Sequence, residues 1–215
     1  VYTVPETTER PKSAGRGHTH EYKYTDNGDG THTGTCTAND STLAPEAHTI
    51  ADGKCTLCGA AQTTESVASV KAADGTVTYF ETLAEAVAAA TDNATVALLK
   101  DMELSADLSI GVKAVLDLNG QTLETNGHEI GITASGDVTV TGSGTVNNKV
   151  PADKAGGTTN RYTMLSAAAG GKLTIENGTF TTQAAQIVYT YGDTTILGGS
   201  FMNTSTDTSD ETVEA

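Results

Sequence analysis

Most of the cysteines and histidines in this sequence lie in its first third. The three cysteines are Cys36, Cys55 and Cys58, and four of the five histidines share their segment: His18, His20, His32 and His48. An odd number of thiols cannot close into disulfides without leaving one free. Zinc takes four nitrogen or sulfur ligands in a tetrahedron, and a closed set of protein ligands makes a structural site. The segment therefore predicts a structural zinc site.

The ligands are predicted from their spacing. Cys55 and Cys58 form a Cys-x-x-Cys turn, in which two thiolates can bind one ion. The predicted ligand set is Cys36, His48, Cys55 and Cys58, with His20 or His32 as the alternative to His48. The alternative to a metal is a disulfide, either Cys55–Cys58 or Cys36–Cys55. A module of roughly 45 residues is too small to bury an adequate core, so a bound metal would stabilise it.

The composition of the whole chain favours strands and turns. Its 215 residues include 23 glycines and many threonines, which disfavour long helices. Against 12 Lys and Arg stand 27 Asp and Glu, and the resulting formal charge of −15 repels phosphate backbones and excludes general nucleic-acid binding. No apolar run approaches the roughly 20 residues that cross a bilayer, so we expect no membrane insertion.

Four stretches in the second half of the chain share one pattern. They start at Leu116, Val138, Leu173 and Thr194, which places the starts 22, 35 and 21 residues apart. Each has two apolar or β-branched residues two positions apart, a bend with Gly or Asn, a hydroxyl residue and a large apolar residue. The long interval contains an insertion at 148–160. A β pattern with a period of about 22 predicts a parallel β-solenoid, in which each copy is one turn of the coil, here called a rung.

Stacking of these copies predicts columns of side chains along the solenoid. Two columns are expected to face the core, Leu118–Val140–Ile175–Ile196 and Leu123–Val146–Phe180–Phe201, beside a hydroxyl column, Thr122–Thr145–Thr179–Ser200. Asp137, Lys172 and Asp193 align along one edge with alternating charge. A slipped register would place like charges together, which supports this alignment.

Local signals complete the expected organisation. Thr82 and Glu85 form a capping box before apolar residues at helical spacing, which predicts one short capping helix at 82–91. The Asp26–Gly30 stretch predicts a hairpin turn in preference to a calcium loop. The expected parts are a linker or disordered segment at 1–15, the Cys/His module at 16–61, a linker at 62–66, the β-helix at 67–203 and a polar tail at 204–215.

The Cys/His module resembles a known repeat. The run from His20 to Gly59 is similar to zinc-ribbon-like repeat modules of large secreted surface proteins of Gram-positive anaerobic bacteria. Asn39 stands where that family commonly has the second cysteine of another Cys-x-x-Cys pair. The resemblance implies an extracellular, cell-surface location and a longer multidomain chain. No signal-peptide pattern follows Val1, which favours a mature or excised segment.

The repeats resemble a second family. Leu116–Leu123, preceded by the predicted helix, is similar to the first rung of pectin-lyase-like proteins. We therefore expect a mainly β protein, a right-handed parallel β-helix with a short N-terminal capping helix, preceded by a small zinc-ribbon-like β module.

The second resemblance also implies an enzyme, a polysaccharide lyase or a glycoside hydrolase. A hydrolase needs two carboxylates about 5–10 Å apart. Asp137 and Asp193 lie two rungs apart with Lys172 between them, and an edge column explains these residues more simply. We therefore expect no catalytic residues.

The predicted function is binding. Tyr189 and Tyr191 are expected to face outward over Thr133 and Ser135, and with Tyr162 from the insertion they would form a ligand-binding platform. A slip of one residue would bury the two tyrosines in the core instead. The expected role is a non-catalytic adhesin-type segment that binds a glycan or a partner protein, and the remaining alternative is a purely structural stalk.

Overall fold

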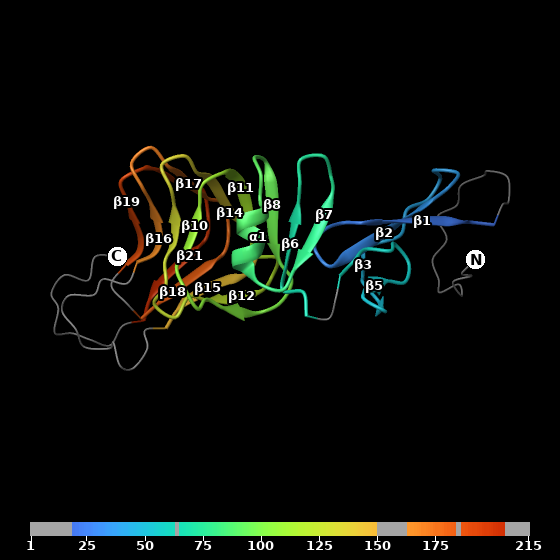
Figure 1. Cartoon of the computed structure of the whole chain (residues 1–215), viewed down its shortest axis with the longest axis horizontal. Coiled ribbons are helices and arrows are strands. Elements are labelled where there is room, and N and C mark those ends of the chain that lie inside the picture. Colours follow the sequence, from blue (N-terminus) through green and yellow to red (C-terminus); the bar gives the residue numbers. More distant parts are fainter. Residues whose placement is uncertain (1–18, 63–64, 150–162, 184–185, 205–215) are drawn as a thin grey trace.

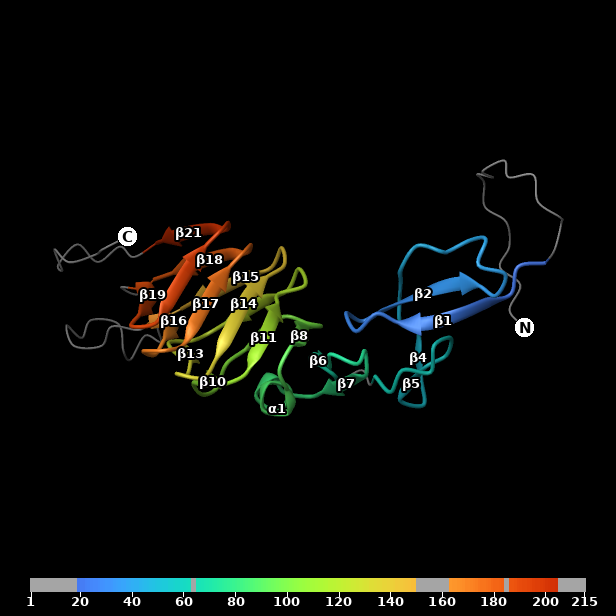
Figure 2. The ribbon, with the colours of Figure 1, turned by 90° about the horizontal axis from the view of Figure 1, so that it is seen from above.

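The computed structural model describes residues 19–62, 65–149, 163–183 and 186–204, and it places two parts one after the other along the chain (Figure 1). A small β module comes first, and a β-solenoid follows it. Seen from above, the module lies beyond β6 and β7, at the end of the solenoid away from the C-terminus (Figure 2). In the described part of the chain, no helix has the length and apolar character that a membrane span requires.

The N-terminal module is built from two small antiparallel sheets. Strands β1 (Tyr22–Asp26), β2 (Thr31–Cys36) and β3 (Glu46–Ala47) form one sheet, and β4 (Ile50–Ala51) and β5 (Lys54–Cys55) form the other. The turn between β1 and β2 is the predicted hairpin. Its two glycines, Gly28 and Gly30, have φ angles of 85° and 84°, a region that side chains rarely adopt.

An antiparallel hairpin and one helix close the end of the solenoid nearest the module. The hairpin consists of β6 (Ala68–Lys71) and β7 (Val77–Phe80), and the helix is α1 (Leu83–Ala89). The Thr82 side chain accepts a hydrogen bond from the Glu85 backbone N–H and donates one to the Glu85 carboxylate. This confirms Thr82 as the N-cap of α1, with the Glu85 carboxylate reaching back to the Thr82 hydroxyl. Leu83, Ala86 and Val87 turn the apolar face of α1 into the core.

The solenoid consists of three sheets in which the strands from β8 onward stack in parallel from rung to rung, while the β6–β7 hairpin joins β8 in antiparallel fashion. The largest sheet has the order β20-β17-β14-β11-β8-β6-β7, the second β21-β18-β15-β12-β9 and the third β10-β13-β16-β19. The strands not yet given bounds are β8 (Ala94–Leu98), β9 (Met102–Glu103), β10 (Leu108–Ile110), β11 (Lys113–Asp117), β12 (Thr122–Glu124), β13 (Ile130–Ile132), β14 (Asp137–Thr141), β15 (Thr145–Asn148), β16 (Thr163–Ala167), β17 (Lys172–Ile175), β18 (Thr179–Thr182), β19 (Gln186–Thr190), β20 (Asp193–Ile196) and β21 (Ser200–Asn203). The predicted mainly β solenoid is therefore confirmed. Most of the predicted insertion at 148–160 lies outside the described residues.

The core columns and the edge column follow from this register. The column Leu123–Val146–Phe180–Phe201 and the hydroxyl column Thr122–Thr145–Thr179–Ser200 are paired as predicted. The charged column is also confirmed, and Lys113 extends it below Asp137. Alternate residues of each strand point inward, so one apolar cluster runs through the rungs.

The other predicted core column is wrong at its first member. Leu116, not Leu118, pairs with Val140, and Asp117 pairs with Thr141. The reason is that the corners differ in length: seven positions separate Leu116 from Leu123, but five separate Ile175 from Phe180. Leu118 belongs to the longer corner, where it is still fully buried.

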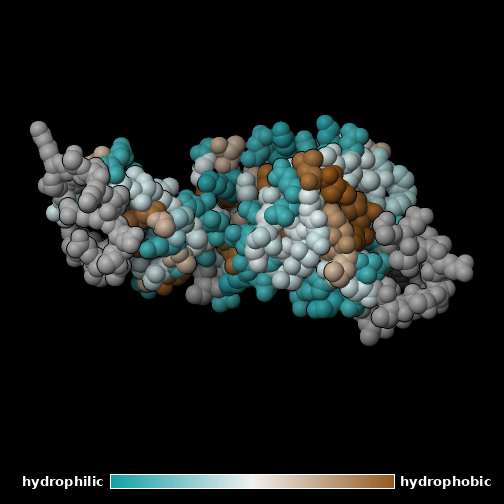
Figure 3. Space-filling view, turned by 180° about the vertical axis from the view of Figure 1, so that it is seen from behind, coloured by the Kyte–Doolittle hydropathy of each residue, from teal (hydrophilic) through white to brown (hydrophobic). Residues whose placement is uncertain are grey.

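The last rung exposes apolar side chains that the inner rungs bury. Ile196 and Phe201 are 54% and 38% exposed, whereas their partners one rung below, Ile175 and Phe180, are fully buried. The space-filling view shows a hydrophobic band on the back of the solenoid (Figure 3). The end of the solenoid that lies away from the module is therefore its more apolar end.

Candidate functional site

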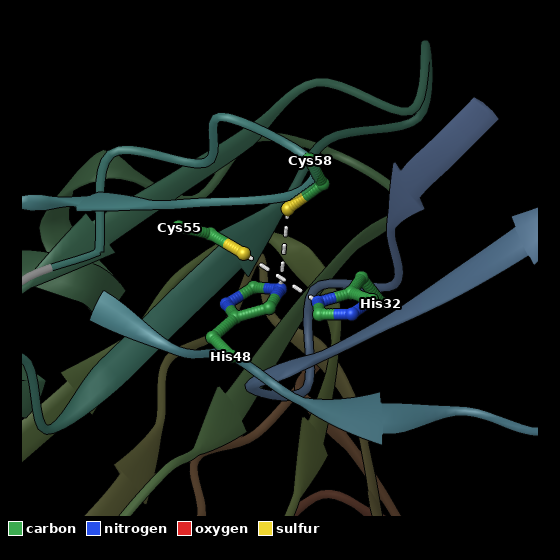
Figure 4. Close-up of side chains that lie close together, drawn as sticks. All are labelled: His32, His48, Cys55 and Cys58. Atoms are coloured by element: carbon green, nitrogen blue, oxygen red, sulfur yellow. Dashed lines mark hydrogen bonds between the residues drawn. The ribbon is translucent and has the colours of Figure 1, made fainter. Parts of the chain in front are cut away.

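Four metal-binding side chains converge in the N-terminal module. His32 comes from β2, His48 from the connection between β3 and β4, Cys55 from β5, and Cys58 from the turn that follows β5. Their ligand atoms all lie within 4.8 Å of one another (Figure 4). Three of these residues belong to the predicted set, and His32, named as an alternative to His48, joins His48 in place of Cys36.

The spacing of these atoms fits a tetrahedral metal. The Cys55 sulfur lies 3.5 Å from His32 Nδ1, and the Cys58 sulfur lies 3.5 Å from His48 Nε2. Zinc bonds of about 2.3 Å to sulfur and about 2.0–2.1 Å to nitrogen place tetrahedral sulfur and nitrogen ligands about 3.5 Å apart. Two sulfur and two nitrogen donors at this separation can hold one soft divalent ion, such as zinc, with all four positions filled by protein.

Surrounding contacts orient the two imidazoles. The Gln62 side-chain oxygen lies 2.5 Å from His48 Nδ1, which leaves Nε2 facing the sulfur of Cys58. The rings of His32 and His48 stack at 5.4 Å, and Tyr24 packs edge-on against His32 at 5.1 Å. A hydrogen bond such as that with Gln62 fixes the tautomer and direction of a metal-binding histidine, whereas the ring contacts of His32 restrict only the orientation of its ring.

The two thiols of the site have different acidities. Burial acts to raise the pKa of Cys55, but hydrogen bonds from the backbone of Cys58 and Leu57 hold this pKa below its usual value. Burial raises the pKa of Cys58 to about 11, and the neighbouring Cys55 adds to that increase. Without metal, the pair therefore keeps a proton on Cys58 at neutral pH, and a metal must displace this proton in order to bind both sulfurs.

We predict that metal affinity rises with pH across the neutral range. The Cys58 proton is bound at every pH below about 11 in the metal-free module, and metal binding releases it. For each proton that metal binding releases, the metal affinity rises about tenfold per pH unit. A zinc competition titration between about pH 6.5 and about pH 7.5 should show at least this increase. An affinity that does not change with pH would contradict binding through Cys58.

Cys36 lies in a different group. It shares this second group with His20 and Asp40, and His20 Nδ1 lies 3.3 Å from the Cys36 sulfur and 3.4 Å from the Asp40 carboxylate. His32 and Cys36 do share one face of β2, since their side chains alternate in the same phase. Four residues of strand span about 13 Å, however, so the two side chains cannot reach the same ion. Their separation of four residues along one strand is therefore the sequence signal that His32 and Cys36 belong to different groups.

The predicted tyrosine pair lies on the outer face of the third solenoid sheet. Tyr189 and Tyr191 are 42% and 74% exposed, so both face outward as expected. Their hydroxyl oxygens lie 2.7 Å apart, and their rings meet edge to face at 5.2 Å. Tyr162, the third predicted ligand-binding residue, lies outside the described residues.

The register beneath the tyrosines differs from the expected one. Tyr189 stacks on Ser166, which stacks on Gly131, whereas the sequence alignment placed it over Thr133. Matching the glycines that follow these strands, Gly136, Gly171 and Gly192, puts Tyr189 over Thr133, but the corner before the glycine is two residues shorter after β19 than after β13 and β16. A shift of two keeps the side chains on the same face, so the outward direction was predicted correctly.

A shallow hollow lies beside the tyrosines. It measures about 510 Å³ and is lined by Ser109, Glu129, Gly131, Ile132, Thr133, Ala134, Ser166, Ala167, Ala168, Tyr189 and Tyr191. The Ser166 hydroxyl donates a hydrogen bond to the Glu129 carboxylate across Gly131. A Cβ at Gly131 would come 3.3 Å from that carboxylate, so glycine leaves the space in which Glu129 lies. Among the described lining residues, Glu129 provides the one charged group.

Comparison of this chain with protein-family models, curated proteins and solved structures found no match. The class of protein is therefore defined by its own geometry. It is a β-solenoid with a small β module whose Cys/His group can hold a metal.

Proposed function

We propose that this chain is a non-catalytic, extracellular binding segment whose solenoid presents the tyrosine-lined hollow to a glycan. The observation that carries this proposal is the exposed pair Tyr189 and Tyr191 beside a hollow with polar groups on its floor. The cell-surface location and the pectin-lyase-like character of the solenoid are parts of the same proposal, and the sequence resemblances support them.

The chemistry of the hollow suits a sugar. A tyrosine ring offers apolar area for the C–H face of a pyranose together with a hydroxyl that can hydrogen-bond. Glu129, Ser166 and Thr133 add groups that can bind sugar hydroxyls. The net charge of −15 and the carboxylate in the hollow both disfavour acidic glycans. The proposed ligand is accordingly a neutral glycan, and a partner protein is the alternative occupant.

Binding fits this hollow better than hydrolysis does. A glycosidase needs a pair of carboxyl groups on either side of the scissile bond. The described lining residues include one, Glu129, and its carboxylate already accepts from Ser166. We therefore assign Glu129 to ligand binding.

We propose zinc as the metal of the N-terminal module. Its support is the donor set, two sulfurs and two imidazole nitrogens in a closed arrangement, which is typical of structural zinc. When bound, zinc would cross-link β2, the connection before β4 and the turn after β5. Closure by four protein ligands favours a stabilising role over a catalytic one.

Replacing both tyrosines by alanine is expected to abolish most glycan binding. A ring contact contributes about 1 kcal/mol or more, so each ring should account for about a fivefold change in affinity or more. The double variant Tyr189→Ala/Tyr191→Ala would be screened against immobilised neutral and acidic glycans, and hits would be measured by calorimetry.

Leu197→Ala is the matched control, because Leu197 is 69% exposed and does not line the hollow. It should bind as the unaltered chain does. Equal binding by the folded double variant would contradict the proposed site, and product formation from a bound glycan would favour the enzyme alternative.

A further inference from the structure

The turn between β1 and β2 makes direct contact with the first elements of the solenoid. Ser69 on β6 donates its hydroxyl hydrogen to the carbonyl of Gly28, and Lys71 Nζ donates to the carbonyl of Asn27 at 3.1 Å. From the corner after β11, Asn119 Nδ2 donates to the carbonyl of Asp29 at 3.2 Å. The module and the solenoid are therefore joined by side-chain hydrogen bonds as well as by the chain between them.

The fit of this turn depends on Gly28. A Cβ at Gly28 would lie 3.3 Å from carbon atoms of both Lys71 and Val77, which is closer than a Cβ usually comes to a neighbour, so the backbone lies tightly against the β6–β7 hairpin. Gly28 is itself buried in this contact. A specific surface on the hairpin thus receives the turn.

One side chain links this contact to the metal-binding group. The Asp26 carboxylate, at the end of β1, accepts a hydrogen bond of 2.7 Å from the Tyr79 hydroxyl on β7. The same carboxylate oxygen lies 3.6 Å from His48 Nε2. The rings of His48 and Tyr79 also pack edge to face at 6.2 Å. A metal ligand, its neighbouring carboxylate and a solenoid residue therefore form one connected set.

The module has little else to hold this arrangement. Among the described residues, the apolar cluster of the protein begins at Val67 and takes no member from the module. Among the described residues of the module, the buried side chains that can bind a metal are those of Cys36, Cys55, His32 and His48. Three of these four belong to the metal-binding group, so a metal would take the place of a hydrophobic core there.

We propose that metal binding by His32, His48, Cys55 and Cys58 locks the module onto the capping end of the solenoid, with Asp26 and Tyr79 transmitting the constraint. The metal-loaded chain is then one rigid rod, and removal of the metal unfolds the module and frees it from the capping end of the solenoid. This inference rests on the proposed metal site and is independent of glycan binding. Asp26 and Tyr79 act as positioning residues.

The test measures backbone amide relaxation by NMR on the full chain, loaded with zinc and then stripped with a chelator. In the zinc form, amides of the module and of the solenoid should report one common rotational correlation time. After chelation, the module amides should report a shorter time than the solenoid amides. The double variant Ser69→Ala/Tyr79→Phe should bind zinc and still show the shorter time, because two contacts across the joint are lost.

Tyr22→Phe is the matched control, since the Tyr22 hydroxyl contacts Ser41 inside the module. With zinc, it should tumble as the unaltered chain does. Common tumbling after chelation, or in the zinc-loaded double variant, would overturn the proposed lock. Zinc content by mass spectrometry separates the two proposals: a chain that binds no zinc contradicts both, whereas bound zinc with unchanged tumbling contradicts the lock alone.

Discussion

Replacing Cys55 with serine is expected to remove the bound zinc and unfold the N-terminal module, while the solenoid remains folded. Serine is a poor zinc ligand, and structural zinc contributes about 10 kcal/mol or more to the folding of small modules. The solenoid should survive because its apolar cluster lies wholly in residues after the module. The zinc content per chain, measured by mass spectrometry, would report the loss of the metal. The dispersion of the module's amide signals in NMR spectra would report its unfolding.

The matched control is Cys36→Ser, which removes a thiol that is equally buried but lies in the group with His20 and Asp40. This variant should keep one zinc per chain. Loss of zinc from Cys36→Ser, together with its retention in His32→Ala, would contradict the geometry and favour the ligand set predicted from the sequence. Full zinc retention by Cys55→Ser would contradict the site altogether.

Phe180→Ala is expected to cause the largest loss of stability of any single core substitution in the solenoid. The Phe180 side chain is fully buried and stacks on Phe201 with ring centroids 5.0 Å apart. Truncation of a buried phenylalanine removes its transfer free energy and leaves a cavity, which together cost about 3–5 kcal/mol. Urea denaturation followed by circular dichroism would measure the decrease in the free energy of unfolding.

Phe201→Ala serves as the comparison, because it removes the same side chain from the same column one rung further on. Phe201 is 38% exposed, so less apolar surface returns to water and the cavity is open to solvent. Its cost should be about half that of Phe180→Ala or less. Equal costs would mean that the last rung is covered as completely as the inner ones.

The period of the sequence predicted the solenoid, but it could not predict every register. Alternation of apolar and polar residues assigns a side chain to the inner or outer face, and this was correct for Phe180 and for Tyr189. Corner length is not encoded in that alternation. The pairing of Leu116 with Val140 therefore depends on a longer corner, which only the three-dimensional path reveals.

The metal-binding group was likewise predictable from the sequence only in part. Local spacing identified Cys55 and Cys58, because a Cys-x-x-Cys turn places both sulfurs on one side. His32 lies on β2 and His48 in the connection between β3 and β4, so the choice of these two histidines depends on how β2 pairs with β3. The contact of the β1–β2 turn with β6 had no sequence signal, since hydrogen bonds to backbone carbonyls place few demands on residue type.

The charged edge column has a consequence for how such a protein can lengthen in evolution. Lys113, Asp137, Lys172 and Asp193 follow one another along the rungs, so every neighbour in the column has the opposite sign. Duplication of one rung would place two lysines or two aspartates side by side, which destabilises a sheet. Duplication of two adjacent rungs preserves the alternation. This solenoid can therefore gain two rungs at a time without further substitutions in the charged column.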